Sequence, residues 1–214
     1  MTMQTCPQRD AFFAFLQEVA GNRAEGLLPR FDCLLDSLLA ENDKVNLVSR
    51  RTPRETFWTA HLLDSILPAR LFPLDGQNVL DFGTGGGLPG LPLKLLFPSC
   101  HMTLLDGTGK KIAAVRNLLK ILDLKACEAV YSRVEELPLQ TWGQRFDTIV
   151  CRSVKLDETT ATVLPRLLRP NGHILLYKGR DFEDTLLFPQ RRVHDISHPM
   201  VGTRNLVVFK KMPI

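Results

Sequence analysis

The chain has 214 residues, of which 44% are hydrophobic and 23% are charged. These values are ordinary for a globular protein with one main core and room for a modest subdomain. The 27 basic and 23 acidic residues give a formal charge of +4, which is compatible with nucleic-acid binding but does not require it. No apolar run approaches the ~18 residues of a membrane span, and residues 1–10 lack an apolar signal-peptide core. We therefore expect a cytoplasmic protein with no membrane partner.

The cysteines give no sign of a disulfide framework or a metal site. They are odd in number and scattered, with no C-x-x-C pair and no neighbouring histidine at metal-ligand spacing. We expect reduced, mostly buried thiols and no bound metal at the five positions, which are Cys6, Cys33, Cys100, Cys127 and Cys151.

The first third of the chain carries three helical patterns. Apolar residues recur at helical spacing over residues 12–19 and again over residues 34–39. A third helix is predicted to begin at Thr52, which can cap it, with Glu55 closing a capping box. We therefore predict an N-terminal helical subdomain over residues 1–72.

The remainder, residues 73–214, alternates between short apolar strands and helical stretches such as residues 110–122. This alternation predicts a mostly parallel, doubly wound α/β sheet. Two further strands, over residues 192–196 and 205–209, are predicted to form an antiparallel hairpin at the end of the sheet. The five predicted parallel strands are centred near Val79, Met102, Ala129, Ile149 and Leu175.

A glycine-rich loop follows the first of these strands. The run from Val79 to Gly90 reads VLDFGTGGGLPG, a short apolar strand that leads into glycines. Because glycine has no Cβ, the backbone at Gly85 and its neighbours can approach a ligand closely. Asp106 ends the next predicted strand and supplies a carboxylate that can hold ribose hydroxyls. The pattern predicts a nucleoside-cofactor site, although a tight turn from strand to helix is the simpler structural alternative.

Two cofactors fit this loop. Residues 85–90 match the G-x-G-x-x-G of NAD-dependent oxidoreductases. However, Asp81 precedes the glycines where such strands are usually apolar, and Pro89 has no N–H to offer a pyrophosphate. Both features favour S-adenosylmethionine, which carries no phosphate. Asp81 either contacts the ligand or shapes its own loop, and the sequence leaves both interpretations open.

Several further motifs occur in order along the chain. They are NLVS from Asn46, HLLDS from His61, LLD from Leu104, SRVEE from Ser132 and YKG from Tyr177. With the glycine loop, they make residues 42–211 resemble the RsmG/GidB family. The resemblance implies a Rossmann-like class I methyltransferase that uses S-adenosylmethionine to methylate N7 of a guanosine in the 16S RNA of the bacterial small ribosomal subunit.

The resemblance also implies which residues contact the cofactor. Glu135 occupies the position at which related enzymes read the adenine amino group, and a carboxylate accepts well from an N–H donor. Without the family match, Glu135 would be interpreted as an ordinary surface acid. The implied contacts to S-adenosylmethionine are Gly83, Leu88, Val134, Glu135 and Arg152.

The implied reaction needs no general base, because guanine N7 carries an in-plane lone pair and loses no proton when it is alkylated. We therefore expect no catalytic acid or base. Arg152 and Lys178, at the ends of the fourth and fifth parallel strands, are expected to position the guanine by donating to O6. His61 is expected to be a packing or hydrogen-bonded residue.

Two basic segments are the expected RNA contacts. One stretch of the chain, residues 44–54, has four cations and no acid, and a second basic pair begins the helix after Asp106. Ordinary surface charge is the alternative interpretation. The residues are Lys44, Arg50, Arg51, Arg54, Lys110 and Lys111.

Two other functions stay open at this point. One is a non-catalytic RNA-binding or ribosome-assembly factor that keeps a methyltransferase fold, and the other is an NAD-dependent oxidoreductase. For the favoured methyltransferase we expect ribosomal RNA or a ribosomal subunit as the partner and a monomeric state.

Overall fold

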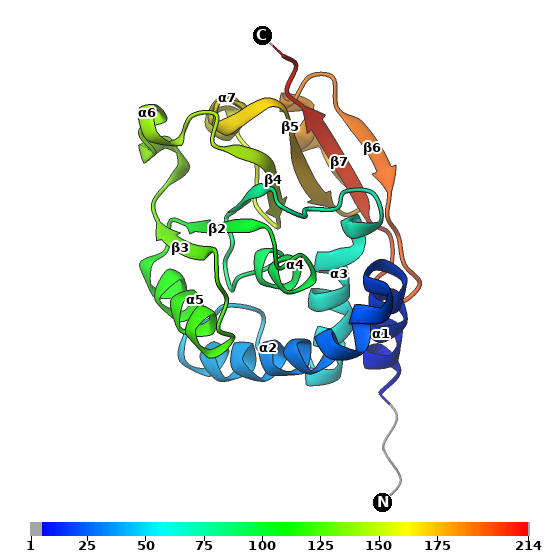
Figure 1. Ribbon diagram of the computed structural model, residues 1–214. Helices are drawn as coiled ribbons and strands as arrows, with labels where there is room; N and C mark the ends of the chain where they lie inside the picture. The colour runs from blue at the N-terminus through cyan, green and yellow to red at the C-terminus, as the bar shows by residue number, and fades with distance from the viewer. Residues whose placement is uncertain (1–5, 214) are drawn as a thin grey trace, which may run out of the picture.

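The computed structural model describes residues 6–213 and is built around a seven-stranded sheet (Figure 1). The strand order is β3-β2-β1-β4-β5-β7-β6. Strands β1 to β5 are parallel, and β7 runs antiparallel to both β5 and β6, which confirms the predicted sheet and its terminal hairpin. The strands are β1 (Asn78–Phe82), β2 (His101–Asp106), β3 (Cys127–Tyr131), β4 (Phe146–Arg152), β5 (Leu168–Lys178), β6 (Arg192–Asp195) and β7 (Asn205–Lys210).

The strand order reverses beside β1. This strand pairs with β2 on one side and with β4 on the other, so that Leu80 lies between Thr103 and Ile149. In a doubly wound sheet, ligands bind beyond the carboxyl ends of the strands at such a reversal. The fold therefore brings the residues after Phe82, Leu105 and Cys151 to one place.

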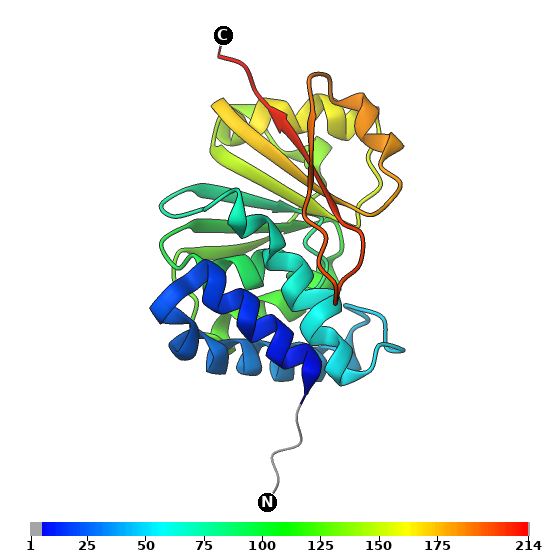
Figure 2. The ribbon, with the colours of Figure 1, turned by 90° about the vertical axis from the view of Figure 1, so that its right-hand side faces the viewer.

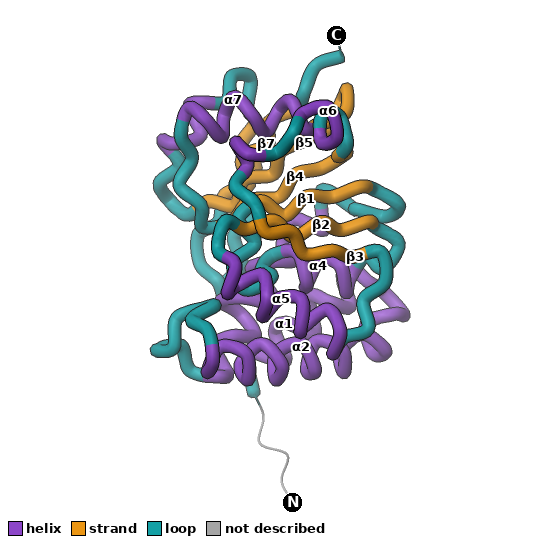
Figure 3. The backbone as a smooth tube through the Cα atoms, turned by 90° about the vertical axis from the view of Figure 1, so that its left-hand side faces the viewer, coloured by secondary structure: helices purple, strands orange, loops and turns teal. Residues whose placement is uncertain are grey.

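Helices cover both faces of the sheet. Figure 3 shows α1, α2, α4 and α5 on one side of the strands and α6 and α7 on the other. Short 3-10 turns connect several of these elements. The helices are α1 (Pro7–Ala20), α2 (Ala24–Lys44), α3 (Asp64–Ile66), α4 (Gly90–Leu96), α5 (Gly109–Ile121), α6 (Leu139–Trp142) and α7 (Glu158–Leu167).

The two faces of the sheet form two apolar clusters. Successive side chains of a strand point to opposite faces. In β1, accordingly, Val79 joins the cluster that contains α1, α2, α4 and α5, and Leu80 joins the cluster that contains α7. The inner strands β1 and β4 are buried on both faces because both faces are covered, which explains why they appear in the sequence as short apolar runs.

The N-terminal helices share their core with the sheet. Phe12 of α1 and Phe31 of α2 belong to the same buried cluster as Leu91 of α4 and Ile112 of α5. Figure 2 shows α1 and α2 lying along the helices that cover the sheet. Residues 1–72 stay a proposed subdomain, and this continuous core weighs against their folding independently of residues 73–214.

The segment after α2 departs from the predicted capped helix. Thr52 does not cap a helix, because Pro53 holds the N-cap position and no side chain makes a capping hydrogen bond there. The Thr52 N–H lies in a turn and donates to Ser49 O (3.3 Å). Pro53 is extended (ψ 146°), so helical structure begins only at Arg54. A 3-10 turn (Arg54–Thr56), a π-helical turn (Trp58–Leu63), α3 and a second 3-10 turn (Leu67–Arg70) then follow in succession. The capping-box prediction was therefore wrong, and the helical stretch it introduced is irregular.

The cysteines in the described part of the chain are free thiols. Cys100 and Cys151 are buried, whereas Cys33 is exposed. Among residues 6–213 no three histidine, cysteine or carboxylate side chains form a group that could hold a metal ion. None of the helices over the same residues is both long and apolar enough to cross a bilayer.

Candidate active site

A pocket of about 750 Å³ lies beyond the carboxyl ends of β1, β2 and β4. A pocket of this size suits a small ligand or cofactor. Every cofactor contact expected from the sequence lines it, together with one of the expected RNA contacts, Lys111. The expected cofactor contacts are Gly83, Gly85, Leu88, Asp106, Val134, Glu135 and Arg152.

The glycine loop uses most of its own backbone donors. Thr84 N–H donates to Leu105 O (2.9 Å), and the N–H groups of Gly87 and Leu88 donate to Thr84 O (2.9 and 3.0 Å). Gly85 N–H donates to Asp106 Oδ2 (2.9 Å). A pyrophosphate needs several free amides directed at it. The loop is therefore built for a ligand without phosphate, which is what Pro89 indicated in the sequence.

Gly83 fits only because it has no side chain. Its φ is +70°, and a Cβ built on it would lie 2.3 Å from Val154 Cγ2. Such a left-handed conformation is unfavourable for other residues. The absent side chain thus lets Val154, in the loop that follows β4, pack directly on the backbone of Gly83 at the edge of the pocket.

Asp81 is a structural residue of the loop. It is fully buried and does not line the pocket. Its Oδ2 accepts hydrogen bonds from Thr84 Oγ1 (2.6 Å) and from Gly90 N–H (2.8 Å). Burial raises the pKa of this carboxyl to about 6. Of the two interpretations left open by the sequence, these contacts favour shaping of the loop.

Asp106 lines the pocket and can accept further hydrogen bonds. Its Oδ1 accepts from Thr108 N–H (2.8 Å) and its Oδ2 from Gly85 N–H (2.9 Å). Each carboxylate oxygen can accept two hydrogen bonds, so one acceptor position per oxygen is left for a ligand hydroxyl. A carboxylate with free lone pairs, beside a loop that has already bonded most of its amides, fits the ribose of S-adenosylmethionine.

The third strand end offers an apolar and an acidic side chain. Val134 is buried and Glu135 is exposed on the 3-10 turn that follows β3, and both line the pocket. Arg133 Nη1 lies 3.7 Å from Glu135 Oε1, beyond hydrogen-bond distance. Glu135 is therefore free to accept from a ligand amine.

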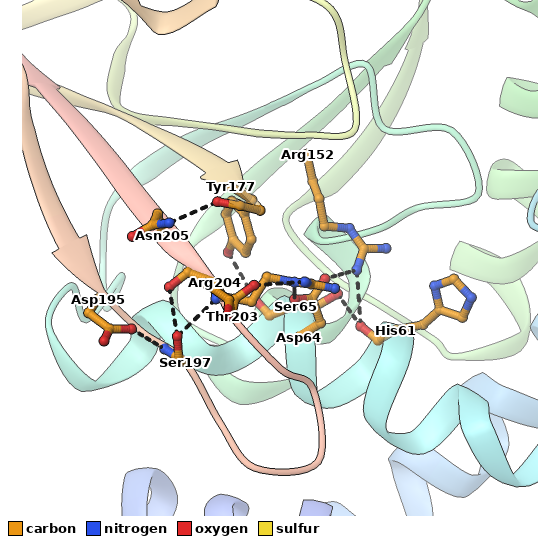
Figure 4. A network of polar contacts seen from close by, with 11 residues as sticks. His61, Asp64, Ser65, Arg152, Tyr177, Asp195, Ser197, Thr203, Arg204 and Asn205 are labelled. Atoms are coloured by element: carbon orange, nitrogen blue, oxygen red, sulfur yellow. Dashed lines mark hydrogen bonds and ion pairs between the residues drawn. The ribbon is translucent and has the colours of Figure 1, made fainter. Parts of the chain in front are cut away.

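Arg152 is held by a carboxylate from another part of the chain. Its Nη1 donates to Asp64 Oδ2 (2.8 Å), and only about 10% of its side chain is exposed. Figure 4 shows Asp64 between Arg152 and Arg204, whose Nε donates to Asp64 Oδ1 (2.7 Å). Lys178 does not line the large pocket. It lines a smaller recess beside it and is paired with Asp184 (Nζ to Oδ2, 2.6 Å).

His61 lines the pocket as a neutral imidazole. Burial, and then the charge of Arg152, lower its pKa to about 4. Its ring packs on Phe57 with the ring centroids 4.8 Å apart. Neither ring nitrogen has a hydrogen-bond partner among residues 6–213. The packing role expected from the sequence agrees with the contact to Phe57.

The expected RNA contacts lie in different surroundings. The acid-free stretch of sequence is not acid-free in space, because α2 supplies Glu41 to Lys44 and Asp36 to Arg54. Arg50 donates to the backbone oxygens of Asn42 and Asp43 (3.1 to 3.3 Å). Among the others, Arg51 and Lys110 are exposed.

Sequence reasoning did not single out four residues that complete the site. Leu47 and Val48 line the pocket and are fixed by Asn42 Oδ1, which accepts from both backbone N–H groups (2.8 and 3.0 Å). These two residues and Asp64 lie in the NLVS and HLLDS motifs, so a signal existed. Arg204 had none, because it reaches Asp64 across 140 residues of chain.

The fold is shared with solved S-adenosylmethionine-dependent methyltransferases. A SAM-dependent methyltransferase from Aquifex aeolicus superposes with a TM-score of 0.58 at 16% identity, over 72% of this chain and 92% of that one. A Thermus thermophilus 16S rRNA methyltransferase, solved with AdoMet and guanosine, gives 0.55 at 23% identity, over 70% and 42%. These structures share the fold.

The family is shown by sequence. The family model described as rRNA small subunit methyltransferase G (GidB) matches residues 28–198. A ribosomal RNA small subunit methyltransferase G from Chlorobaculum tepidum is 42% identical over 161 residues, which cover 75% of this chain and 70% of the relative. A ribosomal RNA small subunit methyltransferase G 1 from Syntrophobacter fumaroxidans is 35% identical over 206 residues, which cover 92% of this chain and 89% of the relative. The chain belongs to this family.

Membership confirms the resemblance found in the sequence and settles the cofactor question. The chain is an S-adenosylmethionine-dependent methyltransferase, and the oxidoreductase alternative was wrong. The antiparallel β7 inserted beside β5 accords with this result, since dinucleotide-binding sheets continue in parallel.

Proposed function

We propose that this protein transfers the methyl group of S-adenosylmethionine to N7 of a guanosine in bacterial 16S ribosomal RNA. The supporting observation is a pocket that has a carboxylate with spare acceptor positions, Asp106, and a loop that has already bonded most of its amides. The curated relatives are named for the RNA of the small subunit, which supports the substrate class.

The cofactor contacts follow from the lining of the pocket. Asp106 holds the ribose hydroxyls, Glu135 and Val134 contact the adenine, and the backbone at Gly83 and Gly85, with Leu88, forms the wall beside the rest of the molecule. S-adenosylmethionine supplies an electrophilic methyl carbon bonded to a sulfonium. Arg152 also lines the pocket and is proposed to orient the bound groups.

The chemistry asks for orientation rather than proton transfer. N7 of guanine attacks with a lone pair that it already has, so no base has to accept a proton. The pocket agrees with this, because its one histidine, His61, is half-buried and has a pKa lowered to about 4, which leaves it neutral near pH 7. Holding two reactants in line can contribute on the order of 7 kcal/mol or more to lowering the barrier. Arg152 and Lys178 are proposed to donate to guanine O6, which leaves N7 free.

RNA outside the reacting nucleotide is proposed to contact two surfaces. One is the loop after α2, with Lys44, Arg50, Arg51 and Arg54, and the other is the start of α5, with Lys110 and Lys111. Of these six residues, Lys111 is the one that lines the pocket. We propose that the protein acts as a monomer in the cytoplasm, where ribosomal subunits are assembled.

The test is methyl transfer to purified small subunits that lack the modification, with S-adenosylmethionine labelled in its methyl group. We expect label in 16S RNA that is recovered as 7-methylguanosine after digestion to nucleosides. Label in a different nucleoside would contradict the N7 assignment. RNA binding without any incorporation would instead support a non-catalytic assembly factor.

A further inference from the structure

Asp64 is the centre of a buried ionic network beside the pocket (Figure 4). Its Oδ2 accepts from Arg152 Nη1 (2.8 Å) and its Oδ1 from Arg204 Nε (2.7 Å). The side chain of Asp64 is 8% exposed, that of Arg152 10%, and that of Arg204 32%. One carboxylate therefore fixes two guanidinium groups that come from β4 and from the end of the loop before β7.

The two cations keep donors for a further partner. Arg152 donates from Nη1 only, to Asp64 and to His61 O (3.4 Å). Arg204 donates from Nε to Asp64 and from Nη1 to Thr203 O (2.9 Å). A guanidinium carries five N–H groups. Within residues 6–213 the Nη2 groups of both side chains make no hydrogen bond to protein.

Both side chains line a recess of about 330 Å³ that adjoins the large pocket. The recess and the pocket share Arg152 and Ser153. Three cations line the recess, Arg152, Lys178 and Arg204. Asp64 lies among them and Asp184 pairs with Lys178 from beside the recess, which leaves one positive charge in excess. This excess of positive charge in a concave, partly buried place attracts an anion.

The loop before β7 is ordered so that Arg204 stays in place. Arg204 O accepts from Ile196 N–H (2.9 Å), and Arg204 N–H donates to Ser197 Oγ (3.0 Å). The next residue, Asn205, donates from Nδ2 to Gly179 O (2.8 Å), which ties the loop to the end of β5. The guanidinium is thus presented by a fixed backbone rather than by a free surface loop.

We propose that this recess binds a backbone phosphate of the acceptor RNA, with Arg204 as its main contact and Asp64 as the residue that positions Arg204 and Arg152. The proposal rests on the RNA substrate proposed above. A guanidinium fork matches the geometry of a phosphate, and RNA supplies a phosphate next to every base. Asp64 accepts hydrogen bonds from both Arg204 and Arg152. The same carboxylate therefore holds the proposed phosphate contact and one lining residue of the methyl-donor pocket.

The experiment compares Arg204→Gln with wild-type protein in binding to small subunits over a range of salt concentrations. Loss of one charge-assisted contact should weaken RNA binding about tenfold. It should also reduce the slope of log affinity against log salt by about 0.7 to 0.9, the value for one phosphate. The dissociation constant for S-adenosylmethionine should stay within about twofold, because Arg204 does not line the large pocket.

Two companion variants separate charge from geometry. Arg204→Lys keeps the positive charge but loses the fork, so we expect the salt slope of the wild type with a partial loss of RNA affinity. Asp64→Asn should change both RNA affinity and S-adenosylmethionine affinity, since it releases Arg152 as well. Arg169→Gln is the matched control, because Arg169 pairs with Asp147 (2.9 Å) away from the recess and should leave both affinities unchanged.

Wild-type RNA affinity and salt slope in Arg204→Gln would overturn the proposal. An equal loss of S-adenosylmethionine affinity and RNA affinity in that variant would also overturn it, since Arg204 would then act on the donor pocket alone. Failure of the proposed function gives a different result, namely wild-type protein that transfers no methyl group to the same subunits. The salt slope still reports on the recess in that case.

Discussion

Asp81 and Gly90 form a tight contact that keeps the glycine loop closed over the end of β1. A Cβ on Gly90 would lie 2.6 Å from Asp81 Oδ2 and 2.2 Å from Leu104 Cδ2. Gly90 N–H donates to that same oxygen (2.8 Å). The last glycine of the motif is therefore required by close packing within the protein.

The substitution Gly90→Ala should lower the free energy of unfolding by about 1–3 kcal/mol, because the added methyl group overpacks a filled site. Chemical denaturation measures the change. Gly26→Ala is the matched control, because nothing lies within 4 Å of a Cβ at Gly26 and the residue is inside α2. That control should gain up to about 1 kcal/mol from helix propensity. Equal effects of the two substitutions would contradict the packing argument.

His61 should make the stability of the protein depend on pH. Its folded-state pKa of about 4 lies below the value of 6.5 for a free imidazole. The unfolded chain therefore binds a proton more readily, so the contribution is present above about pH 6.5 and is lost as the pH falls toward 4. From the size of the shift, the loss has an upper limit of about 3 kcal/mol.

The pH prediction is tested by denaturant unfolding of wild type and His61→Gln between pH 7.5 and about 4.5. The stability difference between the two proteins should narrow as the pH falls. The raised pKa of Asp81 acts in the opposite direction, favouring the folded state at low pH, but it is common to both proteins and cancels in the difference. A difference that stays constant over this range would show that His61 does not titrate as the structure implies.

At the scale of elements, the sequence predicted the strands better than the helical segment after α2. The strands are apolar runs that end in recognisable polar residues, such as Asp106 after β2. The irregular helical segment is instead held by tertiary contacts that no local pattern contains. Tyr177 Oη donates to Ser65 O (2.9 Å), and Ser65 Oγ donates to His61 O (2.5 Å). A π-helical turn of this kind often occurs at functional sites.

Helix α1 should be essential to the stability of the entire molecule. Phe12 is fully buried, and the centroid of its ring lies 4.8 Å from the Phe31 ring centroid and 5.2 Å from the Trp58 ring centroid. Phe12→Ala should lower the free energy of unfolding by about 3–5 kcal/mol. Phe13→Ala, at a half-buried position of the same helix, is the control and should cost clearly less. Similar losses would argue against the shared core.

At the scale of the molecule, the sequence predicted those parts of the site whose residues lie close together along the chain. The loop of Gly83 to Gly90 and the carboxylate of Asp106 carried a local pattern that predicted the cofactor pocket. The network of Asp64, Arg152 and Arg204 did not, because it joins residues that are 88 and 140 positions apart. The packing of α3 against the ends of β4 and β7 brings these side chains together.

The whole account depends on the pocket beyond β1 and β2 being a site for S-adenosylmethionine. Isothermal titration of the wild type and of Asp106→Asn with S-adenosylmethionine, and with NAD as a competitor, tests this most directly. We predict one S-adenosylmethionine per chain, an affinity at least about tenfold lower for Asp106→Asn, and no competition by NAD. Unchanged affinity in Asp106→Asn, or displacement of S-adenosylmethionine by NAD, would contradict it.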